Sequence, residues 1–193
     1  MKIGKPKILA FAGSTRADSF NKKLVKIAAT GASASGAEVT FLDLRDFPMP
    51  LYDGDLEIQR GFSDNVKKFR ALLMGHDGLL ISAPEYNSGI SGVLKNAIDW
   101  ASRPLPGEVP LACFIGKVAV IMSASPGVLG GLRGLVQVRS ILSNIQVLVL
   151  SQQMAIPKAD EAFNTDGMLK DIKQQAAVEA LGSSLAEILV KLI

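Results

Sequence analysis

The sequence has few of the side chains that usually carry structural or catalytic chemistry. Its 193 residues include one cysteine, Cys113, and one histidine, His76. A lone cysteine forms no disulfide within the chain, and one cysteine with one histidine cannot complete a zinc or iron–sulfur ligand set. Ser-His-Asp chemistry could be built only around His76. Any catalytic power therefore has to come from outside the titratable side chains.

The sequence also lacks concentrated charge and long apolar runs. Lysine and arginine number 21 against 18 aspartates and glutamates, a net charge of +3 with no basic cluster, which argues against a nucleic-acid partner. No apolar run approaches the roughly 18 residues of a membrane helix. Lys2, Lys5 and Lys7 precede an apolar stretch (residues 8–12) that is shorter than the roughly seven residues of a signal peptide. We interpret it as a buried strand and expect a cytoplasmic protein without a membrane partner.

Short apolar runs alternate with amphipathic stretches, and 48% of the residues are hydrophobic. Such an alternation is typical of strands that crossover helices bury on both faces. It predicts one α/β domain over residues 1–193, with a doubly wound, five-stranded parallel sheet and helices on both faces. Residues 53–57 and 103–110 are expected to be surface loops. The predicted strands are residues 7–12, 38–42, 78–82, 117–122 and 146–150.

The loop after the first strand, residues 13–21, combines hydroxyl groups, an amide and one arginine at the start of a helix. Backbone N–H groups and the dipole at a helix start favour an anion, and this donor set suits a terminal phosphate monoester. The alternative is a Ser/Thr-rich turn in which Asp18 or Ser19 caps the helix. Capping explains Ser19 but does not explain Ser14, Thr15 and Arg16 together.

Two more polar loops follow the third and fourth strands, at residues 83–92 and 123–131. Glycines in the first of them allow its backbone to approach a flat ring closely. The alternative is a plain turn with Tyr86 packed on the surface. Ligands of open α/β sheets bind beyond the carboxyl ends of the strands, and strands one, three and four are neighbours only in the order 2-1-3-4-5. Convergence of the three loops therefore favours the flavodoxin-like order.

These loops resemble those of a known family, the NADPH-dependent FMN reductases, which include quinone, azo-dye and chromate reductases. Residues 13–21 (GSTRADSFN) are similar to the family's FMN phosphate loop, and residues 84–87 (PEYN) with 92–100 (GVLKNAIDW) resemble its most specific signature. Residues 125–133 resemble its third loop. The resemblance runs from about residue 7 to residue 150. Ser91 stands where the family commonly has proline, which leads us to expect a looser start of the helix that follows.

The resemblance implies bound FMN as the redox reagent, NADPH or NADH as co-substrate, and a small-molecule electron acceptor. It implies ping-pong transfer of a hydride from the co-substrate to FMN and on to a quinone, azo compound, chromate or similar acceptor. Homodimers or homotetramers are usual in the family. No side chain is assigned as catalytic and no metal is expected. The implied cofactor-binding residues are Ser14, Arg16, Ser19, Phe20, Asn21, Pro84, Glu85, Tyr86, Asn87, Ser88, Gly89, Ser123, Ser125 and Gly127.

The resemblance also implies which part of the cofactor each group of residues would contact. Ser14, Arg16, Ser19 and Asn21 would hold the phosphate, residues 84–89 would line one edge of the isoalloxazine ring, and a backbone N–H within residues 85–88 would bond flavin N5 or O4. The serines after the fourth strand and Gly127 would approach the ribityl chain or the nicotinamide.

Two other functions and several residues need separate interpretation. An FMN electron carrier of the flavodoxin type is the main alternative, although such carriers tend to be acidic. A phosphate-binding signalling domain would need more acidic residues at the strand ends. Away from the loops, we expect Trp100 in the core or at a subunit interface, His76 at a helix C-terminus, Cys113 in the core and Arg103 as a candidate subunit contact.

Overall fold

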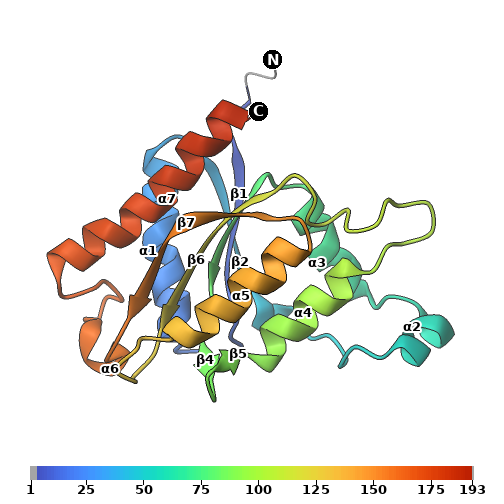
Figure 1. The fold of residues 1–193 in the computed structure, drawn as a ribbon, viewed down its shortest axis with the longest axis horizontal. Helices are drawn as coiled ribbons and strands as arrows, with labels where there is room; N and C mark the ends of the chain where they lie inside the picture. Colours follow the sequence, from blue (N-terminus) through green and yellow to red (C-terminus); the bar gives the residue numbers. More distant parts are fainter. Residues whose placement is uncertain (1–3, 193) are drawn as a thin grey trace.

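A computed structural model describes residues 4–192, so that Lys2 lies outside the described residues. Five parallel strands form its central sheet in the order β2-β1-β3-β6-β7 (Figure 1). Counted along the chain within this sheet, the order is 2-1-3-4-5, which confirms the prediction. The strands are β1 (Lys7–Ala12), β2 (Glu38–Asp43), β3 (Gly78–Ser82), β6 (Val118–Ala124) and β7 (Leu148–Ile156).

Helices cover both faces of the sheet, as Figure 1 shows. Alternate strand residues face opposite sides, so Ile8 packs toward α1 and α7, and Leu9 packs toward α3, α4 and α5. Both side chains are fully buried. The helices are α1 (Phe20–Ala34), α3 (Asp64–Met74), α4 (Gly92–Ser102), α5 (Leu132–Asn144) and α7 (Ile172–Leu192).

The backbones of α1 and α7 come into direct contact through two glycines. A Cβ atom on Gly31 would overlap the carbonyl oxygen of Glu179, and one on Gly182 would overlap that of Ala28. The Ser183 hydroxyl donates to the Gly31 carbonyl at 3.1 Å. The closing helix is therefore fixed against the first helix by backbone proximity as well as by apolar packing.

Several short elements were not predicted. The strands β4 (Glu85–Tyr86) and β5 (Gly89–Ile90) form a hairpin below the carboxyl ends of the sheet strands in Figure 1. The others are the 3-10 helix η1 (Leu44–Asp46) and the short helices α2 (Gly54–Arg60) and α6 (Ala159–Ala162).

The expectation of a surface loop over residues 53–57 is wrong, because α2 begins there. The Asp53 carboxylate caps this helix and accepts from the backbone N–H groups of Asp55 and Leu56 at 2.8 and 3.4 Å. Asp55 and Glu57 lie in the first turn, where the helix dipole favours negative charge. The acidic cluster was thus a helix-start signal.

The bounds of three strands also differ from the prediction, and β2 does so by the single residue Asp43. β6 continues through Ala124, and β7 runs from Leu148 to Ile156 although its middle is polar. β7 is an edge strand with an irregular register opposite residues 119–121, and Arg139 donates to its carbonyl groups at Val149 and Leu150. An edge strand tolerates polar residues because one side stays in solvent.

α5 buries one side against the sheet. Leu135, Val138 and Leu142 are fully buried, whereas Leu132 and Val136 are exposed. Of the residues described, no helix is both long and apolar enough to cross a bilayer.

Candidate functional site

Three loops meet at the carboxyl end of the sheet because their strands end side by side. Gly13 N donates to Ser82 O at 2.9 Å, and Ala83 N donates to Met122 O at 2.8 Å. The loops enclose a cavity of about 50 Å³. It is lined by Ser14, Arg16, Ser19, Phe20 and Asn21 from the first loop, Pro84, Glu85 and Tyr86 from the second, and Ala124, Ser125 and Pro126 from the third.

The first loop presents unused hydrogen-bond donors to this cavity. Ser14 and Ser19 are each 4% exposed. Ser19 is the N-cap of α1, yet its side chain makes no capping hydrogen bond, and no acidic residue lies in the first turn. Arg16 extends from the same loop and is exposed. Two hydroxyls, one guanidinium and a helix N-terminus form a donor set suited to a dianion.

The one acid within this loop is neutralised by a neighbour. Lys23 Nζ lies 2.6 Å from Asp18 Oδ1. The hydrogen bond and charge of Lys23 lower the pKa of Asp18, so its carboxylate stays paired at neutral pH. Phe20 stacks on Phe163, with ring centroids 5.8 Å apart, and closes the α1 side of the cavity.

Asn21, in the first turn of α1, connects the ends of β3 and β6. Its Nδ2 donates to Ala124 O at 2.8 Å, while its Oδ1 accepts from Ser82 Oγ at 2.8 Å and from Ala124 N at 3.0 Å. The side chain is buried, with 4% exposure. Asn21 therefore shapes the cavity by fixing the loops to one another, and these contacts use both ends of its amide group.

Ser91 has the opposite effect to the one expected. Its hydroxyl accepts from Leu94 N at 3.3 Å as the N-cap of α4 and donates to Gly13 O at 2.7 Å. A Cβ on Gly13 would lie only 2.8 Å from the Leu94 Cβ, so the first loop packs directly on α4. Ser91 thus strengthens the start of α4 and connects it to the first loop.

The second loop contributes to the cavity through Pro84, Glu85 and Tyr86. Tyr86 is 53% exposed. Asn87 and Ser88 form the outer turn of the β4-β5 hairpin and have positive φ angles of 53° and 63°. No residue between 4 and 192 accepts a hydrogen bond from the backbone N–H of Asn87 or Ser88. These amides remain able to donate to a ligand.

The third loop places its predicted residues at different depths. Ser125 lines the cavity and Gly127 is exposed beside it. Ser123 is fully buried beneath the loop against Gly131, and its hydroxyl has no hydrogen-bond partner among the described residues. Gly131 has φ 92° and no room for a side chain. Ser123 therefore supports the loop from below and does not line the cavity.

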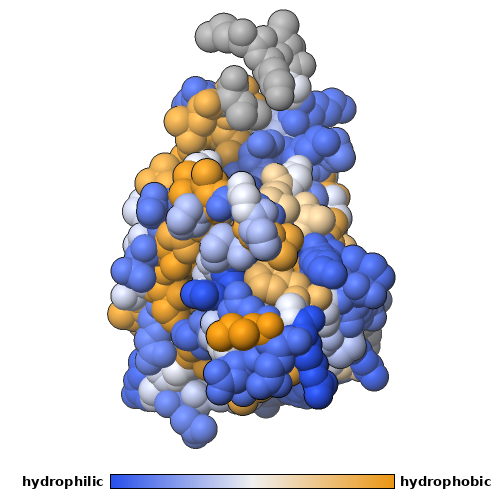
Figure 2. All heavy atoms as spheres, turned by 90° about the vertical axis from the view of Figure 1, so that its right-hand side faces the viewer, coloured by the Kyte–Doolittle hydropathy of each residue, from blue (hydrophilic) through white to orange (hydrophobic). Residues whose placement is uncertain are grey.

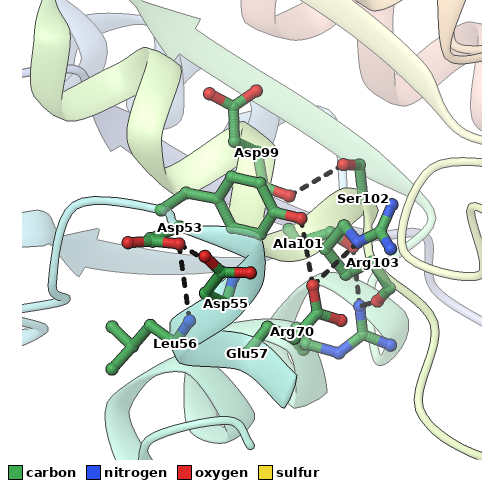
Figure 3. Close-up of polar contacts among 10 residues, drawn as sticks. Asp53, Asp55, Leu56, Glu57, Arg70, Asp99, Ala101, Ser102 and Arg103 are labelled. Carbon is green, nitrogen blue, oxygen red and sulfur yellow. Dashed lines mark hydrogen bonds and ion pairs between the residues drawn. The ribbon is translucent and has the colours of Figure 1, made fainter. Parts of the chain in front are cut away.

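A larger hollow of about 550 Å³ lies away from these loops, between α2 and residues 103–106. Figure 3 shows Arg103 pointing toward Glu57, whose carboxylate accepts from Arg103 Nε and from the Tyr52 hydroxyl, each at 3.0 Å. Figure 2 shows the right-hand side of the molecule in Figure 1, where hydrophobic residues lie among hydrophilic ones. This hollow contains none of the residues predicted to bind a cofactor.

Three residues outside the cavity lie as expected. Trp100 is 1% exposed and packs edge-to-face on Tyr52 and Phe62. His76 follows α3 and its Nδ1 lies 2.6 Å from Leu72 O. Cys113 is fully buried. Glu85 and Tyr86 are the titratable acids among the described residues that line the cavity, and the Glu85 carboxylate accepts from Gly134 N at 2.8 Å.

Comparisons with known proteins identify the family of this chain. The model of the family described as NADPH-dependent FMN reductase matches residues 6–161. The chain is 36% identical to an NAD(P)H-dependent FMN reductase of Pseudomonas aeruginosa over 174 residues, 90% of this chain and 89% of that one. It is also 36% identical to a quinone reductase of Escherichia coli over 148 residues, 77% of this chain and 75% of that one.

A solved structure shares the whole fold. The FerB NAD(P)H:(acceptor) oxidoreductase of Paracoccus denitrificans superimposes with a TM-score of 0.80 at 27% identity, covering 96% of this chain and 98% of that one. The family match implies FMN as cofactor and NAD(P)H as co-substrate. The donor set of the first loop fits the phosphate of FMN. The chain belongs to the NADPH-dependent FMN reductase family.

Proposed function

We propose that this protein transfers a hydride from NAD(P)H to bound FMN and then passes the electrons to a quinone or a similar small acceptor. The observation that carries this proposal is the convergence of three loops on one cavity that is lined by Ser14, Arg16 and Ser19 at the start of α1. FMN, when bound, accepts and donates the electrons, and the protein provides binding, orientation and electrostatics.

The first loop is proposed to hold the phosphate. Ser14 and Ser19 would donate their hydroxyl protons, and the Arg16 guanidinium would pair with the dianion. The burial of both serines and the missing capping bond of Ser19 support this assignment. Asn21 is proposed to position the loop rather than to bind phosphate through its side chain, since its amide already bonds Ser82 and Ala124.

The second and third loops are proposed to orient the ring and the ribityl chain. Residues 84–89 would line one edge of the isoalloxazine, with the unpartnered amides of Asn87 and Ser88 as donors to its N5 or O4. Ser125 lines the cavity and Gly127 is exposed, and the ribityl chain or the nicotinamide is proposed to pass beside them. Tyr86, which is half-exposed, would border the open face.

The acceptor is proposed to be a quinone, with azo compounds and chromate as further candidates. The names of relatives support the quinone class, because they include a quinone reductase of Escherichia coli and a 2-hydroxy-1,4-benzoquinone reductase of Burkholderia. NAD(P)H and the acceptor would use the same open face in turn. The oxidised nicotinamide would then leave before the acceptor binds, which is a ping-pong mechanism.

Initial-rate kinetics test this order. NADPH is varied at several fixed concentrations of a benzoquinone, with the FMN-saturated protein. Parallel lines in the double-reciprocal plot are expected. Intersecting lines would contradict the shared face, and a protein that binds FMN but shows no turnover with either nicotinamide would act as an electron carrier.

A homodimer or homotetramer is proposed as the assembly. Apolar side chains at Leu51, Ile58 and Val109 are exposed by 82, 84 and 65%, and exposed apolar groups of this kind favour association when they lie together. Light scattering coupled to gel filtration measures the mass directly. The mass of one 20.4-kDa chain at micromolar concentration would contradict the proposal.

A further inference from the structure

The hairpin formed by β4 and β5 contacts the first turns of α5 through a partly buried capping interaction. The Oε2 atom of Glu85 accepts from Gly134 N at 2.8 Å. The N-cap of α5 is Gly131, which has no side chain to satisfy the first amides of the helix. Glu85 supplies that acceptor from another loop, and its negative charge lies at the favourable end of the helix dipole.

A second residue of α5 holds the other side of the hairpin. The Nε2 atom of Gln137 donates to Ser88 O at 3.0 Å, and its Oε1 accepts from Ile90 N at 3.3 Å. Arg133 adds a contact from its NH1 to the Ser88 hydroxyl at 3.0 Å. Residues 133 and 134 lie four and three positions before Gln137, so each of them neighbours Gln137 on the helix surface. The first two turns of α5 therefore hold the hairpin in place through these hydrogen bonds.

The hairpin needs such support because its own geometry is unfavourable. Its strands have two residues each, too short to be stable alone. Its turn puts Asn87 and Ser88 at positive φ, where a residue other than glycine is uncommon and carries strain. Gly134 permits the close approach, since a Cβ there would lie 3.3 Å from the Glu85 Cβ.

We propose that Glu85 and Gln137 are positioning residues that fix the backbone amides of the 85–90 hairpin and so set the reduction potential of the bound flavin. The proposal rests on the proposed function, in which those amides donate to the flavin ring. In this proposal the Glu85 carboxylate binds the N-terminus of α5. Only the backbone and the aliphatic part of the Glu85 side chain then remain to contact the cofactor. Gln137, which sequence reasoning did not single out, becomes part of the site.

The expected effect follows from what the amides stabilise. Hydrogen bonds to the ring nitrogens tune the electronics of the flavin, and donors aimed at N5 or O4 favour the electron-rich reduced form. If the hairpin moves from its position, the bound flavin loses part of its preference for the reduced form. A tenfold loss of preference for reduced over oxidised FMN corresponds to a potential about 30 mV lower for a two-electron couple.

The test compares pairs of variants with equal charge. Glu85→Gln keeps an oxygen acceptor for Gly134 N and Glu85→Ala does not, while Gln137→Met removes both hairpin bonds without a change in charge. Val138→Ala is the control, because Val138 is a fully buried neighbour on α5 that faces the core. The midpoint potential of bound FMN, its dissociation constant and the melting temperature are measured for each protein.

We expect Glu85→Ala to have a lower potential than Glu85→Gln, and Gln137→Met a lower potential than the unmodified protein, each by at least the equivalent of a tenfold preference. Val138→Ala lowers the melting temperature and leaves the potential unchanged. Equal potentials within each pair, or a shift in Val138→Ala as large as in Gln137→Met, would overturn the proposal. Failure of the unmodified protein to bind FMN would instead refute the proposed site, and this inference with it.

Discussion

At the scale of single residues, the serines around the cavity differ in whether their hydroxyls are already used. Ser91 both accepts and donates within the fold, whereas the Ser19 hydroxyl makes no capping bond at the N-terminus of α1. Ser123 lies under the third loop with no partner among the described residues. Remaining hydrogen-bonding capacity at the cavity surface, rather than residue type, separates a ligand-binding serine from a supporting one.

Arg16→Ala tests the phosphate assignment. A charge-assisted hydrogen bond is worth about 1.5–3 kcal/mol, so FMN affinity should fall roughly 10- to 100-fold. Riboflavin, which lacks the phosphate, should bind the variant and the unmodified protein equally. Fluorescence titration measures both. Arg60→Ala, in α2, is the matched control and should bind FMN normally, and unchanged FMN affinity in Arg16→Ala would remove Arg16 from the site.

Ser91→Ala tests the observed cap of α4. Loss of the cap and of the bond to Gly13 should reduce the free energy of unfolding by about 1–2 kcal/mol. Ser91→Pro should recover part of this loss, since Ser91 has φ −64°, which proline adopts without strain. Urea denaturation measures the three proteins. A Ser91→Ala protein as stable as the unmodified one would contradict the role of this hydroxyl.

Cys113 should be unreactive in the folded protein. Burial raises the pKa of its thiol, and the side chain has no exposed surface. The reactive thiolate therefore forms only at higher pH than in an unfolded chain. Iodoacetamide at pH 8 should label the urea-unfolded protein within minutes and the native protein far more slowly. Equal rates would mean that the segment around Cys113 opens readily.

At the scale of helices and strands, elements that depend on local pattern were predictable and elements that depend on distant partners were not. The apolar run of residues 78–82 by itself predicts the fully buried strand β3. The hairpin could not be predicted, because it is held by α5 residues such as Gln137, 49 positions from Ser88. α2 had a local signal in the Asp53 cap, which a search for helix-start residues would have found.

Gly182→Ala tests the contact between α1 and α7. The added methyl group would overlap the Ala28 carbonyl oxygen, so the helices must separate. Overpacking of this kind typically costs 1–3 kcal/mol and occasionally more, and the transition midpoint in urea should fall accordingly. Gly92→Ala is the control, since a Cβ there meets nothing within 4 Å. Equal midpoints for the two variants would show that the helices adjust without cost.

At the scale of the whole molecule, the site is a product of strand order. Polar loops after the first, third and fourth strands of the sheet were visible in the sequence, and the order of the sheet brings them to one cavity. The sequence did not show how deeply each residue of these loops is buried. Asn21 bonds groups 61 and 103 positions away, and Ser123 faces inward, so only the folded chain separates the residues that shape the cavity from those that line it.

The scarcity of histidine and cysteine also has its explanation at this scale. Within the described residues, the cavity offers hydrogen-bond donors and an aromatic border, which suffices for binding and orientation when the cofactor carries the electrons.

The reduction of bound FMN by NAD(P)H tests the central claim most directly. The purified protein is saturated with FMN, freed of unbound flavin and mixed anaerobically with NADPH or NADH while the flavin absorbance is followed. Bleaching of the flavin without any second protein, followed by its return when a benzoquinone is added, is the predicted result. A protein that retains no FMN, or retained FMN that stays oxidised with both nicotinamides, would contradict the account.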